Sequence, residues 1–229
     1  MISNTGLIDA YLRKPSPVSE IKRTRSYVDD KKYFFFFKRA FDIIASFLFL
    51  IIVMTWLTPI IALLIKITSK GPVFFLQKRS GRFCKTFTCF KFRTMIVNGE
   101  ADDKQAAVSD ERVTRIGKFL RKSNIDEFPQ FLNVLFGDMS IVGPRPHMLS
   151  ECARFSFVLS GYKFRNIVKP GITGLAQVKG FHGPTINYEN IFGRYQWDIF
   201  YVRNASFGLD FRIMYKTAIQ RVSYLLVWF

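Results

Sequence analysis

Cysteine is scarce in this chain of 229 residues, which contains only Cys84, Cys89 and Cys152. Their number is odd, and their spacing matches none of the patterns in which cysteine and histidine hold zinc. We therefore predict three reduced thiols that are buried or incidental, as suits a protein that faces the cytosol.

Acidic residues are also few: the chain has 17 Asp and Glu against 34 Lys and Arg, a formal net charge of +17. Such an excess indicates a phosphate-rich partner (nucleic acid, anionic lipid or a phosphorylated substrate), unless it is only a solvated basic surface. Hydrophobic residues make up 49% of the chain and aromatic residues 17%, which is high for a soluble domain and favours lipid. None of the usual nucleic-acid-binding motifs is present, so we expect no nucleic acid partner.

Charge is absent altogether from the 23 residues 43–65. As a straight helix this segment would be roughly 35 Å long, enough to cross a hydrocarbon core of about 30 Å. It starts too late for a signal peptide, and no small-residue cleavage site follows it. The alternative is the buried helix of a soluble protein. Residues 1–32, which are polar and mixed in charge, are interpreted as an N-terminal arm.

Basic residues flank this uncharged segment on both sides, and such flanks prefer the cytoplasmic side of a membrane. A helix that enters and turns back satisfies both flanks, whereas a spanning helix satisfies one. Pro59 offers a place to turn, because it clashes with the carbonyl of Thr55 and pushes Thr58 away from helical geometry. The hydroxyls of Thr55 and Thr58 could bond the freed carbonyls. We predict a re-entrant helix over residues 33–66, with a kinked spanning helix as the alternative. The flanking residues are Lys31, Lys32, Lys38 and Arg39, then Lys66, Lys70, Lys78, Arg79 and Arg82.

The scarcity of acids continues to Gly99, since residues 43–99 contain eight Lys or Arg and no Asp or Glu. A patch of one sign next to a membrane fits anionic headgroups or a phosphorylated lipid, or else a solvated face. Within this stretch, residues 72–77 and 86–92 have the composition of strands and enclose a basic turn. That pattern predicts a small hairpin.

Two adjacent acids, Asp126 and Glu127, lie between two predicted helices. Residues 112–122 have an apolar face with helical spacing, and Pro129 fits the first turn of a helix that ends near Gly137. Acids at such a place can serve capping alone, since Asn124 and Glu127 have capping-box spacing. The residues by themselves do not choose between capping and chemistry.

Arg145 lies between Pro144 and Pro146, which stiffen the backbone around it. A fixed guanidinium suits bidentate contact with phosphate, although a structural salt bridge explains it equally well. Further on, residues 169–178 are interpreted as a loop of turn-forming residues that leads into a short strand. Its glycines admit a ligand close to the backbone or serve the turn alone.

Several longer motifs follow one another along the chain. They are Lys38-Arg39-Ala40-Phe41-Asp42-Ile43, Gly71-Pro72-Val73-Phe74-Phe75, Lys91-Phe92-Arg93-Thr94-Met95, Asp126-Glu127-Phe128-Pro129-Gln130, Gly137-Asp138-Met139-Ser140, Val142-Gly143-Pro144-Arg145-Pro146 and Pro170-Gly171-Ile172-Thr173-Gly174. In their residues and their order they resemble the motifs of the bacterial sugar transferases, the monotopic polyprenyl-phosphate phosphoglycosyl transferases. The resemblance covers about residues 33–222, most of the chain.

The resemblance implies a compact α/β fold that is membrane-associated (monotopic), with amphipathic interfacial helices. Its re-entrant N-terminal membrane helix is expected to break at Thr58-Pro59, where the family has a Ser-Pro pair. The chain then divides into the arm 1–32, the membrane helix 33–66 and a cytoplasmic catalytic phosphoglycosyl transferase domain 67–229. The expected location is the cytoplasmic face of the bacterial inner membrane, against inner-membrane lipid.

The same resemblance makes Asp126 the nucleophile and Glu127 a residue that helps to hold the cofactor Mg²⁺. The expected reaction moves a sugar-1-phosphate from a UDP-sugar to undecaprenyl phosphate through a covalent intermediate on Asp126. A carboxylate can attack without a general base, because it is ionised at neutral pH. Such a reaction opens exopolysaccharide, lipopolysaccharide or other glycoconjugate synthesis. The residues that we expect to contact the substrate phosphates are Arg145, Lys91, Arg93 and Arg79.

Two departures from the family's pattern are visible. Phe128 replaces the usual Leu after the acidic pair, and Lys179-Gly180-Phe181 stands where Asn-Gly-Arg is common. Residues 180–185 are more similar to the branch that transfers hexose-1-phosphate, glucose or galactose. The sequence does not determine the identity of the sugar or the oligomeric state, and a homo-oligomer is one of the alternatives. The alternative outside enzymes is a catalytically inactive, membrane-docked basic adaptor, against which the intact Asp126-Glu127 pair argues.

Overall fold

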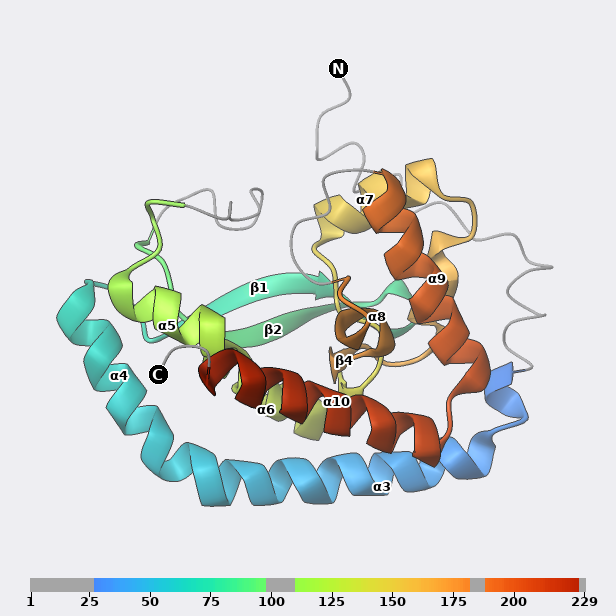
Figure 1. Cartoon of the computed structure of the whole chain (residues 1–229), viewed down its shortest axis with the longest axis horizontal. Coiled ribbons are helices and arrows are strands. Elements are labelled where there is room, and N and C mark those ends of the chain that lie inside the picture. The colour runs from blue at the N-terminus through green and yellow to red at the C-terminus, as the bar shows by residue number, and fades with distance from the viewer. Residues whose placement is uncertain (1–26, 98–109, 182–187, 227–229) are drawn as a thin grey trace.

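The computed structural model describes residues 27–97, 110–181 and 188–226. Most of the N-terminal arm, and residues 182–187 on which the hexose comparison partly rests, therefore lie outside the described residues. Helices and strands are mixed in one body, with a long bent helix along one side (Figure 1). The predicted α/β class is confirmed at this level.

The long helix runs from Lys32 to Thr68 and is the helix in the described part of the chain that is long and apolar enough to cross a membrane. It comprises α3 (Lys32–Phe49), a π-helical segment (Leu50–Met54) and α4 (Thr55–Thr68). Figure 1 shows α3 along the bottom of the body and α4 rising at an angle to it. Only 17% of its most apolar stretch is buried, so its outer surface is free to contact lipid.

The predicted position of the helix break is corrected by the structure. Pro59 and Thr58 both lie inside α4, and the irregular turn precedes Thr55. Proline displaces the helix at the carbonyl four residues before it, so the distortion falls one turn toward the N-terminus. The Thr55 hydroxyl donates to the carbonyl of Ile51 at 2.6 Å, and Trp56 Nε1 donates to that of Ile52 at 2.8 Å. Side chains thus satisfy carbonyls in the π-helical segment, where lipid offers no donor.

The chain after α4 begins with the predicted hairpin, which is confirmed. Strands β1 (Phe74–Ser80) and β2 (Thr86–Phe92) pair antiparallel, with Phe74 opposite Phe92 and Ser80 opposite Thr86. A second, parallel pair joins β3 (Ser140–Val142) to β4 (Gly171–Thr173).

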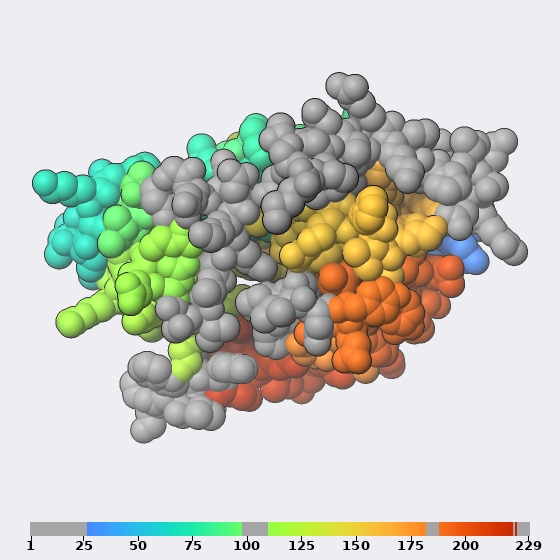
Figure 2. Space-filling view, turned by 90° about the horizontal axis from the view of Figure 1, so that it is seen from above, coloured from blue at the N-terminus to red at the C-terminus, as the bar shows by residue number. Residues whose placement is uncertain are grey.

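Helices surround these two small sheets. They are α5 (Arg115–Ser123), α6 (Gln130–Phe136), α7 (Leu149–Val158), α8 (Leu175–Val178), α9 (Tyr188–Asn204) and α10 (Phe207–Leu226). Seen from above, α5 lies on the opposite side of the body from α7 and α9 (Figure 2). The strand expected near residue 178 is wrong: after β4 the chain forms the short helix α8 instead. Gly137 ends α6 in a left-handed conformation (φ 92°), as predicted from its position.

Helix α10 lies beside α3 and is amphipathic. Its buried face contains Asp210 and Ile213, whereas Phe207, Phe211, Tyr215 and Ile219 form an exposed apolar stripe. Aromatic rings join the two helices, with Phe34 and Phe207 centred 5.0 Å apart and Phe41 and Phe211 6.0 Å apart. The stripe therefore continues the apolar outer surface of α3.

The three cysteines are free, and Cys89 and Cys152 are buried, which confirms the prediction of reduced thiols.

Candidate active site

Asp126 and Glu127 belong to a 3-10 turn, Ile125–Glu127, between α5 and α6. Asn124 ends α5 in a left-handed conformation (φ 59°), and its side chain makes no capping hydrogen bond to the turn. Both acidic residues are buried, at 9% and 5% exposure. The capping-box interpretation of Glu127 is therefore wrong, since its carboxylate points toward other partners.

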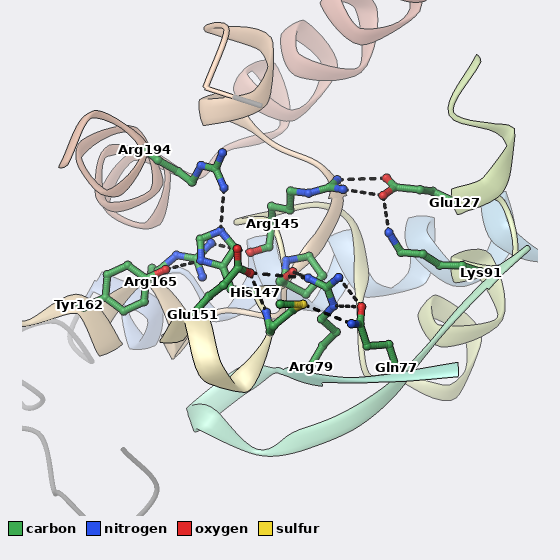
Figure 3. A network of polar contacts seen from close by, with 12 residues as sticks. Gln77, Arg79, Lys91, Glu127, Arg145, His147, Glu151, Tyr162, Arg165 and Arg194 are labelled. Atoms are coloured by element: carbon green, nitrogen blue, oxygen red, sulfur yellow. Dashed lines mark hydrogen bonds and ion pairs between the residues drawn. The ribbon is translucent and has the colours of Figure 1, made fainter. Parts of the chain in front are cut away.

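Those partners are two cations predicted as phosphate ligands. Lys91 Nζ, from β2, lies 2.7 Å from Glu127 Oε1. Arg145 forms a bidentate ion pair with the same carboxylate, with Nη2 at 2.5 Å from Oε1 and Nη1 at 3.0 Å from Oε2 (Figure 3). Burial alone would raise the pKa of Glu127, but the charges of Arg145 and Lys91 outweigh it and hold that pKa well below its usual range. Glu127 is thus a fixed anion.

Asp126 has the opposite electrostatic setting. Burial and the neighbouring charge of Glu127 raise its pKa to about 6, while Lys91, Arg121 and Arg145 act against the rise. No group in the described ranges 27–97, 110–181 and 188–226 donates a hydrogen bond to its carboxylate. The oxygens of a carboxylate are most nucleophilic when the group is ionised and accepts no hydrogen bond.

The turn is also tied to the long helix through Phe128, the residue that departs from the family's Leu. Its ring meets that of Phe49 edge to face, with centroids 5.1 Å apart, and Phe49 also stacks on Phe131 at 4.1 Å. The extra aromatic contact fastens the acidic turn to the end of α3.

Arg145 is held by its backbone as well as by Glu127. The carbonyls of Pro144, Arg145, Pro146 and His147 each accept a hydrogen bond. The donors are Gly171 N at 3.0 Å, Arg165 Nη2 at 2.6 Å, Arg79 Nη1 at 3.1 Å and Ser80 N at 3.0 Å, respectively. Four consecutive carbonyls are therefore fixed, which limits where the Arg145 side chain can reach.

Behind this segment lies a buried polar network (Figure 3). Arg165, 1% exposed, donates Nε–H to Asp198 at 2.8 Å in addition to its bond to the Arg145 carbonyl. The His147 ring contacts the Tyr162 hydroxyl and Arg194, and burial together with the surrounding arginines holds the pKa of His147 well below its usual value. A neutral His147 adds no charge to a region already rich in cations.

Arg165→Met is expected to lower the free energy of unfolding by roughly 3–5 kcal/mol, because it leaves the Asp198 carboxylate buried and unpaired. The double variant Arg165→Met with Asp198→Leu should recover much of that loss. Chemical denaturation in detergent, followed by circular dichroism, measures both. A single variant as stable as the wild type would show that the ion pair does not hold this segment.

The other two predicted phosphate ligands are placed differently. Arg93 donates Nη2–H to the carbonyl of Ser69 at 2.8 Å and also bonds the carbonyl of Lys70, so it fastens the hairpin to the end of α4. Arg79 bonds Gln77 Oε1 and the Pro146 carbonyl, and it lies beneath the Arg145 segment. The structure thus joins Lys91 and Arg145 to the acidic pair, but neither Arg93 nor Arg79.

Sequence reasoning missed Arg121 and Arg165. Arg121 lies in the last turn of α5, close enough to influence the pKa of Asp126, and Arg165 supports Arg145 from a 3-10 segment, Tyr162–Ile167. Arg121 could have been found from its place one turn before the acidic pair. No pattern around Arg165 signals its role.

The acidic pair fits one kind of Mg²⁺ site, in which the protein supplies one or two carboxylates and the substrate completes the coordination. Among the described residues, no group of three His, Cys, Asp or Glu side chains is placed to hold a metal. Each carboxylate oxygen offers about two acceptor sites, so Glu127 Oε2 keeps one beyond Arg145, and Asp126 keeps its own. One or two carboxylates with waters and substrate phosphates are what Mg²⁺ usually takes.

Comparison with known proteins shows the family. The model of the bacterial sugar transferase family matches residues 33–223. The chain is 49% identical over 183 residues to a UDP-glucose:undecaprenyl-phosphate glucose-1-phosphate transferase of Klebsiella pneumoniae, covering 79% of this chain and 39% of that protein. It is 40% identical to a protein of the same name from Xanthomonas campestris pv. campestris, covering 94% and 45%.

A third relative is similar in length. The exopolysaccharide production protein PSS of Rhizobium leguminosarum bv. phaseoli is 42% identical over 194 residues, covering 81% of this chain and 95% of that protein. The chain thus spans less than half of the first two relatives but nearly all of the third. Because the family model covers most of the chain, from the long helix to α10, the chain belongs to the bacterial sugar transferase family.

Proposed function

We propose that this chain transfers a sugar-1-phosphate from a UDP-sugar to undecaprenyl phosphate, releasing UMP, at the cytoplasmic face of the bacterial inner membrane. The observation that carries the proposal is the acidic pair, in which the Asp126 carboxylate accepts no hydrogen bond from the part of the chain that the structure describes, while Lys91 and Arg145 fix Glu127. The names of the relatives from Klebsiella and Xanthomonas support this reaction class and make UDP-glucose the first donor to test, with UDP-galactose next.

In the first step an Asp126 oxygen attacks the phosphorus that bears the sugar. The bond from that phosphorus to the bridging oxygen breaks, UMP leaves with the bridging oxygen, and an aspartyl-phosphosugar remains. Lys91 and Arg145 lie beside the nucleophile, where their charges offset the charge of the diphosphate. Asp126 needs no general base, because a pKa of about 6 leaves it ionised at neutral pH.

In the second step an oxygen of undecaprenyl phosphate attacks the same phosphorus. The bond to Asp126 breaks, the carboxylate is regenerated and undecaprenyl-diphospho-sugar leaves, which completes a ping-pong cycle. Mg²⁺ held by Glu127, with Asp126 nearby, would supply neutralisation of the diphosphate oxygens. The product would open polysaccharide or glycoconjugate synthesis, as the name of the Rhizobium relative suggests.

The test is UMP release by the purified protein in nanodiscs with undecaprenyl phosphate, Mg²⁺ and a panel of UDP-sugars. Sustained UMP formation with one donor, dependent on lipid and metal, supports the proposal and names the sugar. A folded protein that is silent with every donor, beside an active control transferase, would favour the membrane-docked adaptor.

The first step should depend on pH through Asp126. Because its pKa is raised to about 6, the Asp126 carboxylate becomes protonated as the pH falls below that value, and a protonated carboxyl group is not a nucleophile. We expect kcat/KM for UMP release to be flat near pH 7.5 and to fall about tenfold per pH unit below 6. A single turnover without lipid acceptor measures this step alone, so titration of undecaprenyl phosphate does not interfere. A flat profile down to pH 5, with the protein still folded, would contradict the assignment.

We further propose that the helix Lys32–Thr68 is re-entrant, with both ends at the cytoplasmic face. Its bend and the basic residues at both ends support this, since a re-entrant path keeps all of them on one side. The body would then lie at the depth where the lipid phosphate leaves the hydrocarbon.

Thr58→Leu combined with Pro59→Leu should allow a straight helix that spans the membrane and carries the N-terminus to the periplasmic side. A tag at residue 1 should become accessible in right-side-out vesicles to a protease that does not cross the membrane. The control pair Ile60→Leu and Leu63→Ile, on the exposed face of α4, should leave the tag protected. A tag that stays protected in the Pro59 variant would contradict the role of this bend.

A further inference from the structure

Asn133 lies in the middle of α6 and is fully buried, with a relative exposure of 0%. Its side-chain amide faces the edge of β2 that is free of β1, because β2 pairs with β1 along its other edge. The Oδ1 atom accepts a hydrogen bond from Phe90 N at 2.9 Å, and Nδ2 donates one to the carbonyl of Thr88 at 2.7 Å. The amide thus bonds to β2 as a backbone peptide group of a further strand would.

An amide suits this position because the two backbone groups differ. Phe90 offers a donor and Thr88 an acceptor, so the side chain between them must accept with one atom and donate with the other. If the amide were turned over, Nδ2 would face the N–H of Phe90 and Oδ1 the carbonyl of Thr88, and both bonds would be lost. An apolar side chain of the same shape would leave both buried backbone groups unsatisfied.

The backbone of Asn133 is fixed as well. Its carbonyl accepts hydrogen bonds from Gly137 N at 3.1 Å, Asp138 N at 3.0 Å and Met139 N at 3.2 Å, where the chain leaves α6. The amide therefore projects from a rigid helical turn. Since α6 begins three residues after Glu127, one short helix connects the amide to the acidic turn.

The apolar contacts between β2 and α6 set no register. Phe87 and Cys89 of β2 share a buried cluster with Val134 of α6 and with Met139, and apolar contact has no direction. Within the described ranges, no further hydrogen bond links these two elements. A shift of a strand by one residue turns its side chains to the opposite face, and a shift by two moves them by about 7 Å. The amide of Asn133 therefore fixes which residue of β2 reaches the acidic turn.

That residue is Lys91, which follows Phe90 in β2. Its Nζ lies 2.7 Å from Glu127 Oε1 (Figure 3). A ring is thus closed, from the acidic turn through α6 to the amide, across to β2, and back through the ion pair. We propose that Asn133 is a positioning residue, whose amide holds Lys91 beside Glu127 and Asp126 where the substrate phosphates arrive. This inference rests on the proposed function, because that function assigns the phosphates to Lys91.

Asn133→Ala is expected to lower kcat/KM for single-turnover UMP release by about 10–100-fold, since small displacements of a group beside the reacting atoms have effects of this size. The charge of Lys91 lowers the pKa of Asp126. A displaced Lys91 should let that pKa rise, so the acid limb of the pH profile should move upward. The control Thr217→Val breaks a 2.6 Å hydrogen bond to Thr173, between α10 and β4, and should lower Tm without moving the limb.

A double-mutant cycle with Lys91→Met tests whether Asn133 acts through Lys91. In the Lys91→Met background, Asn133→Ala should lower the rate by less than about threefold, whereas Thr217→Val should have the same effect in both backgrounds. The same cycle is measured by Tm in detergent, which needs no turnover. There the two substitutions together should lower Tm by less than the sum of their separate effects.

If Asn133→Ala does not fold, Asn133→Ser replaces it, because a serine hydroxyl can bond one of the two backbone groups. A wild type that releases no UMP from any donor would contradict the proposed function, and the Tm cycle would then decide alone whether Asn133 holds Lys91. Additive effects of the two substitutions, or an acid limb that stays in place in an active Asn133→Ala protein, would overturn the positioning role and leave the proposed function standing.

Discussion

Asp126→Asn is expected to lose nearly all turnover, by at least about a thousandfold, while membrane association and fold are kept. Asparagine has the shape of aspartate but no charge, so it does not form the acyl phosphate at a useful rate. The substitution also removes a buried carboxylate whose pKa is raised, so the variant should be as stable as the wild type or more stable at pH 7.

Two measurements separate this outcome from a structural defect. Single-turnover UMP release without lipid should vanish in Asp126→Asn, and intact-protein mass spectrometry should show no sugar-phosphate adduct, which the wild type should accumulate. The matched control is Asp138→Asn, since Asp138 lies just beyond α6 and its carboxylate accepts a long hydrogen bond, of 3.5 Å, from Asn133 Nδ2. An Asp126→Asn protein with a tenth or more of the wild-type rate would remove Asp126 as the nucleophile.

Local signals in the sequence predicted the elements that lie closest to the site. Residues 72–77 and 86–92 predict the hairpin because they enclose a basic turn; β2 has the predicted bounds, whereas β1 begins later, at Phe74, and ends later, at Ser80. Gly137 predicted the end of α6 because a left-handed residue closes a helix at little cost when it has no Cβ. Such signals depend only on neighbours along the chain.

Contacts between distant segments were not predictable in this way. The β3–β4 pair joins Ser140 to Gly171, and nothing in either three-residue strand specifies its partner. The helix α8 took the place of an expected strand because its apolar side chains, Leu175, Ala176 and Val178, are buried on several sides. Arg93 shows the same limit: its motif predicts a phosphate ligand, but its guanidinium donates hydrogen bonds to two backbone carbonyls just after α4.

The interpretation of Glu127 changed for a related reason. Its spacing from Asn124 is that of a capping box, and only the fold reveals that Lys91 and Arg145 reach its carboxylate from β2 and from the segment after β3. The two interpretations of Arg145, as a partner in a salt bridge and as a phosphate ligand, are then compatible. Its salt bridge is made with the acidic pair itself, so the guanidinium lies where substrate phosphates would arrive.

Arg145→Lys and Arg145→Met should therefore differ in a diagnostic way. Lysine keeps the charge but does not make the two parallel bonds to Glu127, and we expect kcat/KM to fall by about 10²–10³ with the pH profile unmoved. Methionine also removes a charge that lowers the pKa of Asp126, so that pKa should rise above about 6. The ionised nucleophile is then populated only at higher pH, and the acid limb of the profile should move upward.

Profiles of single-turnover UMP release from pH 5 to 9 measure both effects, with Arg115→Lys, an exposed position at the start of α5, as the control. A fall in rate with no shift of the acid limb in Arg145→Met would mean that Arg145 positions Glu127 without acting on Asp126. A rate in Arg145→Lys within threefold of the wild type would show that charge alone suffices. The bidentate geometry, and the four hydrogen-bonded carbonyls that support it, would then serve stability and not the reaction.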